Sequence, residues 1–461
     1  MLLGPPLPVF WSGVSCFRPP ERTNETGGDG PSIAECDAHG DGAAPDPPLT
    51  HGYLPAIYLD AHWPGIQGDR VGGRYGTSLT VVPDIDGDGL DEVAAAEWGS
   101  GFTEHQLHFH TGAQLVERAA SSASLASFES SDPPLAAMDI DFDGSPELLT
   151  SGRAFHFLAG PTPTGPPVDG LSGWSDDTQF GLGNIWGGGT VTLVTPDLAL
   201  ALYDLTAFAD QGWNVQPPKT LGHGIDLGVT AVTAYDFTSD GVDDVARWGI
   251  LTTQLEPNGP FEGLRMFESP LPREDFHLDD FRRAAWTTSI EGATALGLSS
   301  AGDTTGDGTN DLLVHSFRPP PGDARYNSVT RLLTDPATGE HSLADAQGIF
   351  RAIHHEPGEA HYRTRIVGDL SNDGFADMVL HDEAGLAGSV ATYIYFGPAC
   401  GILDLAESAD LVLPQTEGIC DFDSGHFDAD DSRDLVLSYC LKDWALAPNA
   451  GRNYVMFGAD L

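Results

Sequence analysis

The sequence Asp84-Ile85-Asp86-Gly87-Asp88-Gly89-Leu90-Asp91-Glu92-Val93 decides the fold of this chain. It places aspartates at alternate positions, follows them with a glycine, and ends on an acid and an apolar residue. A hard cation such as Ca²⁺ takes about six to eight oxygen ligands from carboxylates, backbone carbonyls and water, in a loop that needs a glycine to turn back on itself. The stretch therefore predicts a cation-binding loop.

The same pattern recurs along the chain. Further copies start at Asp139, Asp236, Asp303 and Asp369, and an altered copy starts at His426, with Asp431 where the others have glycine. The starts are 55 to 67 residues apart, except for one gap of 97 residues between the second and third copies, which is too long for one unit. Within that gap, residues 190–203 have the pattern of two strands joined by a tight turn, which we interpret as a unit whose cation loop is deleted. We therefore count seven repeated units.

Each unit has the pattern of an antiparallel sheet. An apolar strand leads into the loop, a second strand follows it, a third ends near a glycine, and the connection to the next unit has room for a fourth. We predict an all-β fold, a single seven-bladed β-propeller of four-stranded antiparallel blades over residues 51–461. The last unit is one strand short, so residues 53–59 are expected to complete it and close the ring. Residues 1–50, rich in Pro, Gly and acids, are expected to form a leader and a flexible tether.

The repeated loops resemble the FG-GAP (VCBS) repeats of the integrin α-subunit propeller and of related bacterial secreted proteins. Phe-Gly-like pairs, Tyr75-Gly76 and Phe180-Gly181, precede the first and third units. The resemblance covers residues 51–461, nearly all of the predicted propeller. It implies that each loop joins the first two strands of a blade and holds Ca²⁺ on one face, and that a partner binds loops on the opposite face. An EF-hand does not fit, because its bidentate Glu stands at position twelve between helices.

Positions one, three, five and nine of each loop are expected to supply side-chain oxygens, and position seven a backbone carbonyl. Five loops are predicted to hold Ca²⁺, those with Thr or Ser at position three more weakly because they carry less charge. The sixth, starting at His426, is predicted to be weakest, because imidazole is a poor ligand for a hard cation. Plain acidic turns are the alternative, although clustered carboxylates would repel one another. The predicted ligands are Asp84, Asp86, Asp88, Leu90, Glu92, Asp139, Asp141, Asp143, Ser145, Glu147, Asp236, Thr238, Asp240, Val242, Asp244, Asp303, Thr305, Asp307, Thr309, Asp311, Asp369, Ser371, Asp373, Phe375, Asp377, Asp428, Asp430 and Asp434.

The net charge of the chain limits the classes of partner that it can bind. It has 21 basic and 68 acidic residues, for a formal net charge of −47. Nucleic acid and anionic membrane surfaces are disfavoured, since both need a basic footprint. No apolar run reaches the ~18–20 residues of a membrane span, so we expect no transmembrane segment. We expect a monomer, outside the cell or in the cell envelope.

The five cysteines show no zinc-binding spacing. Cys400, Cys420 and Cys440 could supply one disulfide, and buried free thiols are the alternative; no pairing among these and Cys36 can be assigned. Cys16 follows a mildly apolar start and is a candidate for the acylated residue of a lipoprotein signal. A disordered start is the alternative there.

No sequence motif for catalysis stands out: there is no Gly-x-Ser-x-Gly, no His-Glu-x-x-His and no phosphate-binding loop. Pro357 and Gly358 exclude a metal-binding helix at 355–361. His108 and His110 share a strand face and either form a transition-metal pair or are plain strand surface. Six tryptophans either fill core or stack on sugars, and core filling is favoured: Trp63, Trp98, Trp174, Trp186, Trp213 and Trp248.

These features favour a non-enzymatic binding or adhesion module, held rigid by Ca²⁺ and recognising a protein or glycan with its loop face. The alternative is a carbohydrate-active propeller, either a polysaccharide lyase or a lectin-like protein. A lyase needs basic groups around an acidic sugar. The chain has only two lysines, Lys219 and Lys442, which disfavours a lyase.

Overall fold

The computed structural model describes residues 52–53, 63–68, 70, 72–98, 105–116, 124–130, 134–140, 142–150, 153–155, 168–169, 180–196, 200–210, 219–223, 227–251, 261–287, 294–299, 302–318, 326–334, 339–343, 346, 348–354, 362–382, 390–399, 401–404, 409–415, 419–430, 432–440 and 450–458. Cys16, the candidate for lipid anchoring, lies outside these ranges. So do several other residues discussed above: Cys36, Cys400, Asp141, Asp431, Trp174, Trp213 and residues 355–361.

Within these ranges the strands form seven sheets, which we number in chain order. The first holds β2 (Leu79–Val82), β3 (Glu92–Trp98), β4 (His105–His110) and β5 (Ala126–Ser130), and the second β6 (Pro134–Met138), β7 (Glu147–Thr150), β8 (Arg153–Phe155) and β9 (Val168–Asp169). The third holds β10 (Gly181–Gly183), β11 (Thr192–Pro196), β12 (Leu200–Asp204), β13 (Lys219–His223) and β17 (Phe276–His277), and the fourth β14 (Leu227–Tyr235), β15 (Asp244–Leu251), β16 (Phe261–Phe267), β18 (Arg282–Thr287) and β22 (Gly339–Ser342). The fifth holds β19 (Thr294–Ser299), β20 (Leu312–Arg318), β21 (Tyr326–Leu333), β23 (Gly348–His354) and β27 (Gly401–Asp404), and the sixth β24 (Tyr362–Gly368), β25 (Asp377–Asp382), β26 (Val390–Tyr395), β28 (Leu411–Gln415) and β1 (Gly52–Tyr53). The seventh holds β29 (Asp421–Gly425), β30 (Asp434–Tyr439) and β31 (Arg452–Met456).

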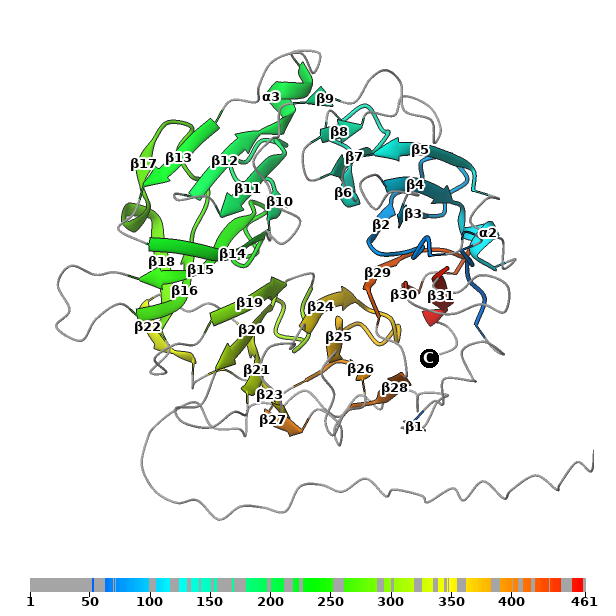
Figure 1. The fold of residues 1–461 in the computed structure, drawn as a ribbon. Helices are drawn as coiled ribbons and strands as arrows, with labels where there is room; N and C mark the ends of the chain where they lie inside the picture. Colours follow the sequence, from blue (N-terminus) through cyan, green and yellow to red (C-terminus); the bar gives the residue numbers. More distant parts are fainter. Residues whose placement is uncertain are drawn as a thin grey trace, which may run out of the picture.

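The fold is all-β, as predicted, and most sheets are built on four antiparallel strands in chain order. Figure 1 shows the sheets following one another around a ring, with the first strand of each sheet nearest the middle. Helical structure is short in the described ranges: α2 (Gly112–Val116), α3 (Leu205–Asp210) and the 3₁₀ helix η3 (Leu278–Phe281). No described helix is long and apolar enough to span a membrane.

The apolar core lies between the sheets. Six clusters of buried side chains each join two sheets that follow one another along the chain, and a seventh cluster joins the seventh sheet to the first. In that last cluster, Leu79 and Val93 of the first sheet pack with Val436 and Val455 of the seventh. β30 packs between the sixth sheet and the first and is buried at every residue, with Leu435 and Leu437 toward the sixth sheet and Val436 toward the first.

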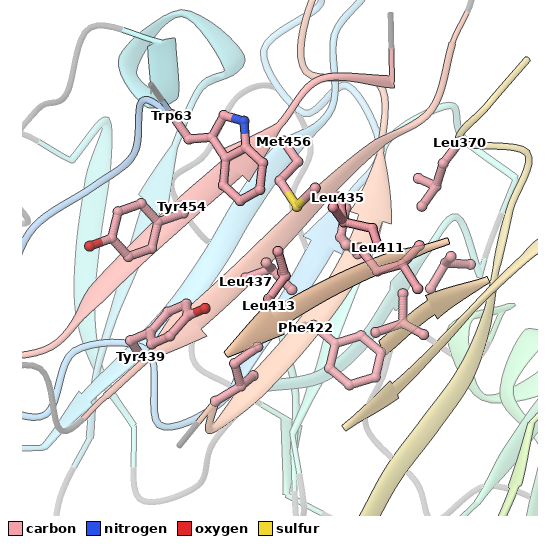
Figure 2. Packing of buried hydrophobic residues seen from close by; sticks show 14 residues of the cluster. Trp63, Leu370, Leu411, Leu413, Phe422, Leu435, Leu437, Tyr439, Tyr454 and Met456 are labelled. Atoms are coloured by element: carbon pink, nitrogen blue, oxygen red, sulfur yellow. The ribbon is translucent and has the colours of Figure 1, made fainter. Parts of the chain in front are cut away.

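Figure 2 shows the cluster between the sixth and seventh sheets. Leu411 of β28 lies against Leu435 of β30, and the rings of Tyr439 and Tyr454 meet edge to face at 5.2 Å. Trp63 belongs to this cluster and is 5% exposed, and Trp248 lies buried between the fourth and fifth sheets. The core role predicted for these two tryptophans is confirmed. Trp98 and Trp186 are only partly buried.

The closing strand differs from the prediction. β1, which contains Tyr53, pairs in parallel with β28 at the outer edge of the sixth sheet and does not complete the seventh. Residues 64–68 lie beside β31 instead: the Val455 N–H donates to the Pro64 carbonyl at 3.0 Å, and the Asn453 N–H to the Ile66 carbonyl at 2.8 Å. A segment following the predicted one therefore supplies the fourth, irregular strand of the seventh sheet.

The third sheet also differs from the prediction. The hairpin at 190–203 is formed by β11 and β12, the second and third strands of the sheet, and the first strand is β10. The cation loop is therefore not deleted: residues 184–191 join β10 to β11, in the place that the acidic loop occupies in the other sheets.

Parallel outer strands were not anticipated from the sequence. β17, β22, β27 and β1 each pair in parallel with the fourth strand of a sheet to which they are not adjacent in the chain. Three of them lie in the connections of later units, so the sheets are tied together at their outer edges as well.

One disulfide joins Cys420, just before β29, to Cys440, just after β30. Because β29 and β30 pair with Asp421 opposite Ser438, the bond fixes the open end of this hairpin. The disulfide alternative is therefore confirmed for this pair.

Candidate metal centres

The seven loops occupy one place in the fold. In every sheet, a loop joins the first strand to the second, with position one at or near the end of the first strand and position nine at or next to the start of the second. Position two points into the core and is at most 5% exposed in all seven: Ile85, Ile140, Ile185, Phe237, Thr304, Leu370 and Phe427. One buried side chain thus anchors each loop to its sheet.

The acid at position nine closes the loop. It lies buried in all six acidic loops, and in five of them its carboxylate accepts a hydrogen bond from the backbone N–H of position two. Ile85 donates to Glu92 Oε2 at 2.6 Å, and Leu370 donates to Asp377 Oδ2 at 2.7 Å. The same bond forms at Ile140–Glu147, Thr304–Asp311 and Phe427–Asp434, with distances of 2.6–2.8 Å. In the fourth sheet the Phe237 N–H donates to the Tyr235 carbonyl instead, and Asp244 accepts from the Ser269 N–H at 2.8 Å.

The exposed acids are held by the loop backbone. At position five, Asp88 Oδ1 accepts from the Leu90 N–H at 2.9 Å, and the corresponding bond forms in all six acidic loops. At position one, Asp236 accepts from the N–H groups of Asp240 and Gly241, as do Asp139, Asp303 and Asp369 in their loops. A carboxylate has about four lone-pair sites, so these bonds orient the acids and leave oxygen capacity for a cation.

Among the described residues, carboxylate oxygens converge within the first loop and within the last. Ligand atoms of Asp84, Asp86 and Asp88 lie within 4.8 Å of one another, and the same holds for Asp428, Asp430 and Asp434. The last loop is thus arranged as closely as the first, although it was ranked weakest. Its His426 turns away from a ligand role, with Nδ1 3.0 Å from the Ser432 carbonyl oxygen, the position-seven carbonyl.

The acids at position nine carry the largest pKa shifts in the loops. Burial, strengthened by the negative charge of the neighbouring aspartates, raises the pKa of Glu92 to about 8. Burial likewise raises the pKa of Asp311 and Asp377 to about 7, and of Asp244 and Asp434 to about 6. A divalent cation beside these groups would reverse the effect, because it favours the ionised form.

The donor set fits a hard cation. Glu92 is fully buried, and its Oε1 has no hydrogen-bond partner in the described part of the chain, whereas its Oε2 holds the Ile85 N–H. An unpaired buried carboxylate oxygen is costly. The charges of Asp84, Asp86 and Asp88 act on Glu92, so its carboxylate lies near theirs, and carboxylate oxygens are the ligands that Ca²⁺ takes.

Neighbouring loops are hydrogen-bonded to one another around the ring. The Asp91 N–H, at position eight of the first loop, donates to the His426 carbonyl at 2.7 Å, and the His426 N–H donates back to Asp91 Oδ2 at 2.9 Å. Asp243 and Asn184 form the same reciprocal pair between the fourth and third loops. Position eight contacts position one of the preceding loop in two further cases, Asn310 with Asp236 and Ala376 with Asp303.

The third loop has lost its carboxylates. Asn184 stands at position one, Trp186 at position three, and Gly187, Gly188 and Gly189 follow with φ of 70–75°. Asn184 Oδ1 accepts from the Thr190 N–H at 3.2 Å, so an amide replaces the aspartate as the acceptor. Thr192 occupies position nine. This loop keeps the shape of the others without acidic ligands.

His108 and His110 are not strand surface. They lie opposite Ala95 and Val93 on the face of the first sheet that packs on the seventh, and they are 5% and 0% exposed. His108 Nε2 lies 3.3 Å from Glu97 Oε2, and both rings meet Tyr75 at 5.8 Å between centroids. Burial, and the nearby His108, lower the pKa of His110 to about 3. We call Tyr75, Glu97, His108 and His110 the seam cluster.

Comparisons with known proteins add little. No family model matches the chain, and no curated protein is significantly similar. Among solved structures, Raptor from Chaetomium thermophilum aligns over 88% of this chain with 11% identity and a TM-score of 0.46. The chain spans 30% of that protein's length. BamB from Moraxella catarrhalis aligns over 83% of this chain and 85% of its own, with 10% identity and a TM-score of 0.35.

Proposed function

We propose that this chain is a seven-bladed β-propeller of the FG-GAP type, whose six acidic loops bind Ca²⁺. The observation that carries the proposal is that the acidic loop recurs between the first and second strands of six sheets. Each of these six loops has a buried acid at position nine. The glycines of the two Phe-Gly-like pairs support it. A Cβ on Gly76 would overlap the Ser438 hydroxyl of the seventh sheet, and one on Gly181 would lie 2.6 Å from the Ala234 nitrogen of the fourth.

The role of Ca²⁺ in this proposal is structural. Extracellular calcium modules have dissociation constants of ~0.1–1 mM, so ~1 mM Ca²⁺ would stabilise the fold by about 0.4–1.4 kcal/mol per site. Several sites together approach the stability of a typical domain. A chelator should therefore lower the melting temperature by many degrees, and added Ca²⁺ should restore it. An unchanged melting curve would contradict the proposal.

We further propose that the protein acts outside the cell or in the cell envelope as a non-enzymatic binding or adhesion module. The Cys420–Cys440 disulfide supports an oxidising compartment, where Ca²⁺ is also abundant. The choice of a binding module rests on the resemblance of the loops to FG-GAP repeats. The partner would be a protein or a glycan on the face opposite the calcium loops.

The binding role is tested with the calcium-loaded chain on a glycan array and, in parallel, in a uronate-release assay on acidic polysaccharides. Glycan binding that is lost in chelator would identify a lectin-like module. Release of unsaturated uronate would replace the proposal with a lyase. If neither glycan binding nor uronate release is observed, the search turns to a protein partner.

A further inference from the structure

The seam cluster lies apart from the calcium loops and has the ligand types of a different metal. Glu97 lies near the end of β3 that is farther from the first loop, and His108 and His110 lie on the neighbouring strand β4. All three are at most 5% exposed. Imidazole with a carboxylate suits borderline transition metals such as Zn²⁺, whereas the acidic loops suit hard cations.

The spacing of the first two donors matches a shared ion. Zinc lies about 2.0–2.2 Å from imidazole nitrogen and carboxylate oxygen, so two such ligands at a tetrahedral angle are about 3.3–3.6 Å apart. His108 Nε2 and Glu97 Oε2 are 3.3 Å apart. His110 lies on the same face two residues along β4, with its ring centroid 6.2 Å from that of His108. The ligand atoms of Glu97, His108 and His110 do not all lie within 4.8 Å of one another, so His110 becomes the third ligand only if its side chain rotates toward the other two.

The surroundings of the cluster also fit a metal site. The Ser124 hydroxyl lies 3.4 Å from His108 Nδ1, so it holds that nitrogen and leaves Nε2 directed at Glu97. Metal-binding histidines are commonly oriented in this way through the other ring nitrogen. Glu97 Oε1 and the Tyr75 hydroxyl are buried and have no hydrogen-bond partner among the described residues. Such groups are costly to bury unless an ion or water completes them.

Two other buried histidines provide a contrast. His315 Nδ1 lies 2.7 Å from the Thr330 hydroxyl directly opposite it, and His381 Nδ1 lies 2.9 Å from Thr392 in the same arrangement. Each of these has a hydroxyl across the strand pair. His108 has Ala95 opposite it on β3 and Ser127 on β5, and its Nδ1 also lies beside a hydroxyl, that of Ser124. The difference lies at its other ring nitrogen, because Nε2 is 3.3 Å from Glu97 Oε2.

We propose that Glu97, His108 and His110 bind one transition-metal ion of the Zn²⁺ class in the seam between the first and seventh sheets. Neither the calcium proposal nor the binding role is needed for this site. All three ligands belong to β3 and β4 of the first sheet, so the ion would tie these two strands together on the face that packs on the seventh sheet.

The test uses the full chain in saturating Ca²⁺, so that the acidic loops are filled. Zn²⁺ affinity is measured by competition with a chromophoric chelator, and Co²⁺ binding by its visible absorption. We expect one tight site. His108→Ala should remove it, and Ser124→Ala, which changes no ligand, should weaken it by about 10–100-fold. His315→Gln is the matched control and should bind as the wild type does.

Folding of each variant is checked by circular dichroism before titration. Absence of a tight site in the wild-type chain would overturn the proposal. Equal affinities for wild type, His108→Ala and Ser124→Ala would overturn it too, because the ion would then be bound elsewhere. Equal losses in His315→Gln and His108→Ala would do the same, by showing that the effect follows general destabilisation.

Discussion

Replacing Glu92 with glutamine should have opposite consequences with and without Ca²⁺. Glu92 is fully buried, and its pKa of about 8 means that at neutral pH without a cation the acid is mostly protonated. Glutamine has nearly the shape of that neutral acid and still offers an acceptor to the Ile85 N–H. In chelator, Glu92→Gln should therefore change the free energy of unfolding little, and at pH 8 it should be neutral or stabilising.

With Ca²⁺ present, the same substitution removes one of four carboxylates from the first loop. The affinity of that site should fall, and the variant should lose up to about 1.4 kcal/mol of the calcium-dependent stabilisation. The assay compares urea unfolding of wild type and variant in chelator and in millimolar Ca²⁺. Thr192→Val, at position nine of the loop without carboxylates, is the control, and its difference in unfolding free energy from the wild type should be the same in chelator and in Ca²⁺.

The reasoning would be refuted if Glu92→Gln lost the same free energy in chelator as in Ca²⁺. The carboxylate would then serve only the hydrogen bond to Ile85. A variant as stable as the wild type in both conditions would refute it as well, because no cation would depend on this acid.

Three further predictions follow from the same contacts. Burial raises the folded pKa values of Glu92, Asp311 and Asp434 to about 6 to 8, from unfolded values of about 4. Without Ca²⁺ their contribution to stability is therefore complete below about pH 4 and is lost as pH rises from there through the folded pKa values. Urea unfolding of the chelated protein should show stability falling from about pH 4 to about pH 8, and a rise over that range would contradict the assignment. Asp91→Ala removes the acceptor of the His426 N–H and should cost about 1–3 kcal/mol of unfolding free energy, measured against Asp91→Asn, which keeps an acceptor; equal loss in both would exclude the hydrogen bond as the cause. Cys420→Ser should cost about 3 kcal/mol, because the disulfide closes a short loop, and a reductant should destabilise the wild type but not the variant.

The acidic loops could be read from the sequence because their interactions are local. All predicted ligands of a loop lie within nine residues, and the bond from position two to position nine closes inside that span. The strands on either side of each loop could also be predicted, because a short apolar run precedes and follows each loop. The identity of any bound ion and of the partner stay predictions.

The third loop was wrongly predicted to be deleted, because it lacks the acidic residues by which the other loops were recognised. The third loop keeps its length and its buried Ile185, but it has no acid to mark it. Phe180-Gly181 just ahead of it was the available signal, because the corresponding Tyr75-Gly76 precedes the first loop.

The repeated loop and the alternation of strands were determined by the sequence alone, through contacts between residues close in the chain. Tertiary structure decided what distant segments do. It placed β1 on the sixth sheet, brought residues 64–68 to β31, and buried the seam cluster against the seventh sheet. Strand periodicity tells which side chains share a face, but only the packing of the sheets determines whether that face meets water or another sheet.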